Sequence, residues 1–67
     1  MLTNAQQELA AANHNLIYAV LNKHNLPEED YYDIAAIGLC MAASTYDASK
    51  GAAFSTYAYR VIANEVL

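Results

Sequence analysis

Two histidines and one cysteine are the side chains that could bind a metal ion or act in nucleophilic chemistry. His14 and His24 are ten residues apart in a segment with helical periodicity, which places them about 15 Å apart along a helix axis. Cys40 adds a third type of ligand, but the three residues show none of the short spacings that zinc sites use. We therefore expect no metal site and no cofactor, and the lone thiol suggests a reducing compartment or plain packing.

Four acidic residues lie close together after Pro27, namely Glu28, Glu29, Asp30 and Asp33. Such carboxylates can serve acid–base chemistry or cation binding, but they also complement the dipole at the start of a helix. The chain has no glycine-rich phosphate loop and no Ser/His/Asp arrangement that its spacing singles out. The sequence therefore favours the helix-dipole explanation and predicts that the protein is not an enzyme.

Aromatic residues are the remaining chemical candidates, with six tyrosines in the chain. Five of them lie from residue 31 onward: Tyr31, Tyr32, Tyr46, Tyr57 and Tyr59. Tyrosine can stack on nucleic-acid bases, or it can pack in a core with its hydroxyl group reaching water. Composition alone favours packing.

The 67 residues allow one small domain, which we expect to span residues 1–67. Apolar residues make up 57% of the chain, and the formal net charge is −4. The three basic residues Lys23, Lys50 and Arg60 are scattered, which argues against ordinary electrostatic binding to nucleic acid. No apolar run approaches the length of a membrane span, and the N-terminus does not resemble a signal peptide. We expect a cytoplasmic protein.

Hydrophobic periodicity and alanine content predict an all-α fold of three helices, at about residues 3–24, 27–45 and 54–66. Thr3 or Asn4 can cap the first helix, and Pro27 suits the first turn of the second. The second helix carries no charge from residue 34 to residue 43, and Gly38 lies within this stretch. Because glycine costs about 1 kcal/mol in a helix, we expect another helix to approach closely there. The third helix meets the end of the chain without a cap, so we expect it to be cut short.

The order of the motifs resembles the second conserved region of bacterial RNA polymerase sigma factors of the housekeeping type. The resemblance is carried by residues 30–39, which end in Ile-Gly-Leu, by Tyr46-Asp47, by Gly51 and by the Phe-Ser-Thr-Tyr-Ala string at 54–58. Residues 12–17 are also similar to the opening of that region, so the likeness covers about residues 12 to 66. It implies an all-α domain whose second helix docks on the clamp helices of the polymerase's largest subunit. It also implies that the third helix captures unpaired bases of the promoter's minus-ten element.

Carried over by position, the resemblance assigns polymerase binding to one set of residues in the second helix. The set is Asp30, Asp33, Ile34, Ala36, Ile37, Cys40 and Met41. Several of these positions are more apolar than in the family, which has Gln-Glu where this chain has Asp33-Ile34. Partner contacts are therefore expected to be partly apolar.

The resemblance assigns DNA contact to Tyr46, Phe54, Ser55, Thr56, Tyr57, Arg60 and Asn64. A Trp-Trp pair that many members carry is replaced by Arg60-Val61, and the basic residues usual before the phenylalanine are replaced by Ala52-Ala53. We expect promoter recognition to be weak in these 67 residues, or to be supplied by sequence beyond Leu67.

Two hypotheses follow from these features. In the first, the chain is a sigma-like domain that binds the largest subunit of the RNA polymerase core, with weak contact to promoter DNA. In the second, it is a degenerate sigma-like module that binds another protein or forms a homodimer through its apolar second helix, without binding DNA.

Overall fold

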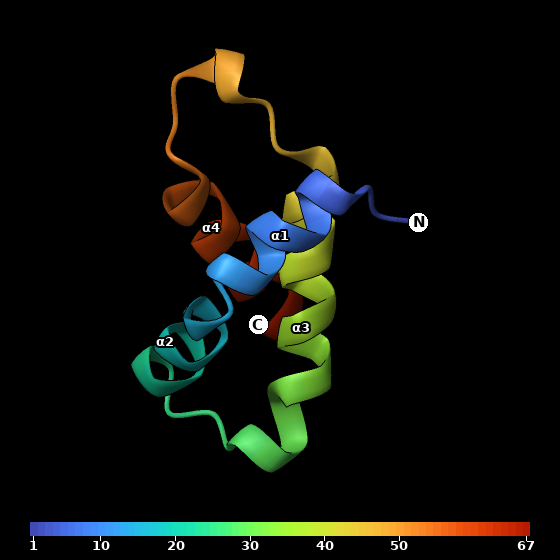
Figure 1. The fold of residues 1–67 in the computed structure, drawn as a ribbon. Helices are drawn as coiled ribbons and strands as arrows, with labels where there is room; N and C mark the ends of the chain where they lie inside the picture. Colours follow the sequence, from blue (N-terminus) through green and yellow to red (C-terminus); the bar gives the residue numbers. More distant parts are fainter.

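The computed structural model describes residues 1–67, which form helices joined by short turns and contain no strand (Figure 1). The helices are α1 (Asn4–Ala12), α2 (Asn15–Lys23), α3 (Glu28–Thr45) and α4 (Phe54–Val66), with a single 3-10 turn η1 (Ala48–Lys50) before α4. The predicted all-α class is confirmed. None of the helices has the length and apolar character needed to cross a membrane.

The expectation of one continuous helix over residues 3–24 is wrong, because the chain breaks between α1 and α2. Asn13 ends α1, and its Nδ2 donates a hydrogen bond to the Leu9 carbonyl oxygen over 2.9 Å. Asparagine side chains compete with the backbone in this way and favour helix ends. The alanines before Asn13 and the apolar periodicity that resumes at Leu16 hid this break. At the other end of α1, Thr3 is the capping residue.

The other two expected helices correspond to α3 and α4. Pro27 is the N-cap of α3, and Glu28, Glu29 and Asp30 occupy its first turn, where negative charge is favoured. α4 begins at Phe54 and ends at Val66. The segment between them, which carries η1, projects from one end of the molecule (Figure 1).

The core lies between α2, α3 and α4, and none of its buried side chains comes from α1. Its members are Ile17, Val20, Leu21, Ala35, Leu39, Ala42, Ala43, Phe54, Ala58, Ile62 and Val66. The four from α4 are spaced by four residues, as expected for the inner stripe of an amphipathic helix.

α3 and α4 approach each other closely at Gly38. A Cβ atom at this position would lie 3.0 Å from Cα of Ile62 and 3.3 Å from Cγ of Glu65. The close approach expected from the sequence is therefore confirmed.

Candidate functional site

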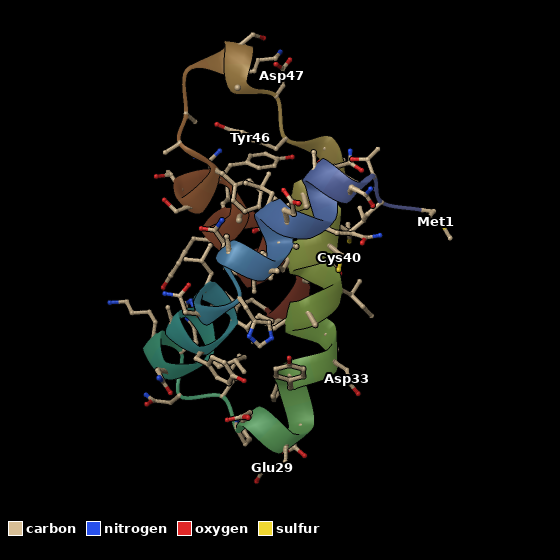
Figure 2. All side chains as sticks on the ribbon, viewed as in Figure 1. Met1, Glu29, Asp33, Cys40, Tyr46 and Asp47 are labelled. Atoms are coloured by element: carbon tan, nitrogen blue, oxygen red, sulfur yellow. The ribbon has the colours of Figure 1, made fainter.

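The residues assigned to polymerase binding share one side of α3, which we call the α3 face. It comprises Asp30, Asp33, Ile34, Ala36, Ile37, Cys40 and Met41. All are exposed except Ala36, which is half-buried. Figure 2 shows Asp33 and Cys40 pointing outward from α3. The structure thus brings this whole set together on an accessible surface.

Large apolar side chains dominate the middle of the α3 face. Ile34 is 39% exposed, Ile37 is 57% exposed and Met41 is 42% exposed. They are three or four residues apart, so they form one continuous strip rather than scattered points. Contiguous exposed apolar surface of this kind typically marks a contact with another molecule.

A shallow groove runs along this strip, between α3 and the segment that precedes α1. It is lined by Met1, Leu2, Ala36, Ile37, Cys40, Met41 and Ser44. The sequence analysis missed Leu2, which lies before the periodic pattern begins. Its only signal was its place directly before the helix cap, where apolar residues often pack.

Three aromatic rings gather where α3 ends and α4 begins. The centroid of the Tyr46 ring lies 5.2 Å from that of Phe54 and 5.9 Å from that of Tyr57. The Tyr46 hydroxyl donates to the Ala52 carbonyl oxygen over 2.6 Å, and the hydroxyls of Tyr57 and Thr45 share a hydrogen bond of 2.7 Å. The positions of Tyr46 and Tyr57 are therefore fixed by both packing and hydrogen bonding.

Next to these rings lies a depression that we call the aromatic pocket, lined by Thr45, Tyr46, Asp47, Lys50, Ala52, Tyr57 and Arg60. It holds two of the three basic residues of the chain, Lys50 and Arg60. Lys50 was not among the residues predicted to contact DNA, although a basic residue in the turn before the expected DNA-binding helix could have indicated such a contact. An aromatic platform beside two cations suits a stacked base and its phosphates.

The remaining residues assigned to DNA contact do not all join this pocket. Phe54 is only 7% exposed because it starts the buried stripe of α4, so stacking of a base on its open face is not compatible with the structure. Ser55 and Thr56 lie in a separate depression with Leu16 and Tyr59. Asn64 is exposed one helical turn beyond Arg60. Only Tyr46, Tyr57 and Arg60 of the assigned set line the pocket.

A second aromatic cluster, which the sequence analysis did not foresee, joins α2 to α3. The His14 ring lies 5.6 Å from the Tyr18 ring and 5.7 Å from the Tyr32 ring, and Nε2 of His14 is hydrogen-bonded to the Tyr32 hydroxyl. Partial burial, and then the neighbouring Tyr32 and Glu28, raise the pKa of Tyr18 above its ordinary value. The cluster contains one histidine and no cysteine, and no three metal-ligating side chains come together anywhere in the structure.

Residues 9–67 match the protein-family model described as Sigma-70 region 2. No curated protein and no solved structure matches the chain. The match spans most of the 67 residues and confirms the resemblance seen in the motifs. Members of this family are non-enzymatic transcription regulators that bind RNA polymerase and act in transcription initiation. The chain belongs to the sigma-70 region 2 family.

Proposed function

We propose that the protein binds the RNA polymerase core in the bacterial cytoplasm by docking its α3 face on the clamp helices of the largest subunit. The observation that carries this proposal is the exposed strip of Ile34, Ile37 and Met41. Burying apolar surface contributes about 25 cal/mol per Å², so a partner that covers this strip gains affinity from it. Family membership supports polymerase as that partner.

The negative charge at one end of the strip supports a partner with a basic segment at that end. Asp30 and Asp33 lie on the α3 face, and Glu28 and Glu29 are exposed beside them at the start of α3. A basic segment of a partner would meet this end, and complementary charge accelerates encounter and fixes register. The apolar strip then supplies the contact area.

The test measures binding of the 67-residue protein to bacterial core RNA polymerase and to its isolated clamp helices. We expect Asp30→Lys and Asp33→Lys each to weaken binding by about tenfold, because each places a like charge against the basic partner. Glu65→Lys makes the same change in charge on α4, outside the α3 face, and should alter the dissociation constant by less than about twofold. Absence of binding by the unchanged protein at about 100 µM would contradict the proposal.

We further propose that contact with the minus-ten element is weak in this chain and involves the aromatic pocket. Tyr46 and Tyr57 supply the platform, while Lys50 and Arg60 are the only cations lining it. Stacking contributes about 1–3 kcal/mol per base, but two cations neutralise few phosphates. Stronger promoter recognition would come from sequence beyond Leu67.

This second proposal is tested by titrating a labelled single-stranded minus-ten oligonucleotide at several salt concentrations. With two cations engaged, the logarithm of the association constant should fall against the logarithm of salt concentration with a slope of about −1.4. Lys50→Gln should halve that slope, whereas Lys23→Gln, at the end of α2, should leave it unchanged. A slope that responds equally to both changes would contradict a role for the pocket.

The exposed strip of the α3 face also favours a second candidate function. A degenerate sigma-like module would use this strip to bind another copy of itself and would not bind DNA. The mass of the protein in solution separates the two candidates.

A further inference from the structure

The segment before α1 holds an apolar side chain against the α3 face. Leu2 is half-buried, and it shares the groove with Ile37, Cys40 and Met41. It is not among the side chains packed on the hydrophobic core. The core therefore does not explain its position, and the groove is its environment.

Local structure leaves Leu2 without an apolar partner on α1. An apolar residue before the N-cap often packs on the fourth residue of its own helix, but that residue here is Gln7. Gln7 instead uses its Nε2 to donate to the Leu2 carbonyl oxygen over 3.3 Å. The Leu2 backbone is thus hydrogen-bonded to α1, but the Leu2 side chain has no apolar partner at that position of the helix.

A capping box holds the backbone directly after Leu2. The Thr3 N–H donates to Oε1 of Gln6 over 2.8 Å, and the Gln6 N–H donates to Oγ1 of Thr3 over 3.1 Å. These two bonds satisfy free N–H groups at the start of α1 and hold Thr3, the residue after Leu2. A partner lying on the α3 face would therefore meet Leu2 as well as Ile37, because both line the groove.

We infer that Leu2 is a direct contact of the docked partner and forms the side wall of its groove, an inference that rests on the proposed function. The partner is one amphipathic helix, taken to be a clamp helix of the polymerase's largest subunit. No charged side chain lines the groove itself, while Asp30 and Asp33 lie toward the start of α3. The complementary helix is therefore apolar where it passes Leu2 and basic where it passes Asp33.

The experiment compares Leu2, which lines the groove, with Leu67, which does not. Leu2→Ser should weaken binding to core polymerase about five- to twentyfold, as expected for a side chain in the buried part of an interface. Leu67→Ser removes an exposed leucine that does not line the groove, and it should leave binding within about twofold. Leu2→Met keeps an apolar side chain of similar volume and should retain binding close to the original.

Ile37→Asp is measured alongside these variants, since it tests the α3 face without Leu2. If Ile37→Asp weakens binding and Leu2→Ser does not, the role of Leu2 is overturned while the docking face stands. If the unchanged protein does not bind, or Ile37→Asp has no effect, the proposed function itself fails. Circular dichroism of each variant must show the original helix content. If Leu2→Ser instead dissociates a dimer of the protein, the occupant of the groove is a second copy and the polymerase helix is excluded.

Discussion

A single carboxylate organises the turn that brings Lys50 to the aromatic pocket. Oδ1 of Asp47 accepts hydrogen bonds from the Ser49 hydroxyl over 2.6 Å and from the Ser49 backbone N–H over 2.9 Å. The side-chain bond, and then the backbone bond, hold the pKa of Asp47 below its ordinary value of 3.8. Because the pKa is lowered in the folded protein, the carboxylate contributes stability above about pH 3.8, and this is lost as the pH falls through the folded pKa.

Ser49→Ala removes the larger of these two effects. We expect the pKa of Asp47 to rise toward 3.8 without reaching it, because the backbone bond remains. Carbon-detected NMR titration of the side-chain carboxyl group measures this directly. Ser44→Ala, whose hydroxyl bonds to the Met41 carbonyl instead, should leave the Asp47 titration unchanged. An Asp47 pKa of 3.8 in the unchanged protein would contradict the turn as described.

At the scale of elements, some helix boundaries and faces could be predicted from the sequence and others could not. Pro27 with its acidic followers marks a helix start, and the spacing of Ile34, Ile37 and Met41 defines a face, so α3 and its surface were predictable. The break at Asn13 was not, because Leu9 and Leu16 keep a helical spacing across it, although Asn13-His14-Asn15 are weak helix formers.

The residues assigned to DNA contact show where assignment by position in the family fails. Hydrophobic periodicity places Phe54 on the apolar side of α4 with Ala58, Ile62 and Val66, whereas the family resemblance assigned it to DNA contact. In the structure Phe54 is buried, and Ser55 and Tyr57, two residues apart on the helix, line different depressions. Leu2 and Lys50 lie in segments without periodicity, so only the folded structure brings them to their sites.

Packing of α4 on α3 depends on the missing side chain at Gly38. Gly38→Ala gains about 1 kcal/mol of helix propensity but forces its Cβ to 3.0 Å from Cα of Ile62, a backbone atom that moves only with α4. Overpacking of this kind costs about 1–3 kcal/mol, so we expect a net loss of about 1 kcal/mol in the free energy of unfolding. Urea denaturation measures this loss. Ser44→Ala, exposed on the same helix, should not be destabilised, and a Gly38→Ala variant more stable than the parent would show that α4 has room to move.

At the scale of the whole molecule, the size of the α3 face limits what it can do alone. The eighteen residues of α3 make a helix about 27 Å long and about 10 Å wide, which gives a face of roughly 270 Å². A stable interface buries about 800 Å² on each partner. A twofold dimer formed through α3 must pair this small patch with itself, whereas a larger partner can also cover the neighbouring segments, including Leu2.

We therefore expect the protein to be a monomer of 7.3 kDa at about 10 µM and to self-associate only at concentrations approaching the millimolar range. Met41→Glu should leave the mass measured by light scattering unchanged and still weaken polymerase binding at least about fivefold, because it places a charge in the apolar strip. Met1→Glu provides the matched change at a fully exposed methionine, which lies at the edge of the same groove and should have a smaller effect. A dimer at 10 µM that Met41→Glu dissociates would instead favour the self-association module. In that case the α3 face recognises its own copy, and the affinity for polymerase should fall as the protein concentration rises, since both partners compete for Ile34, Ile37 and Met41.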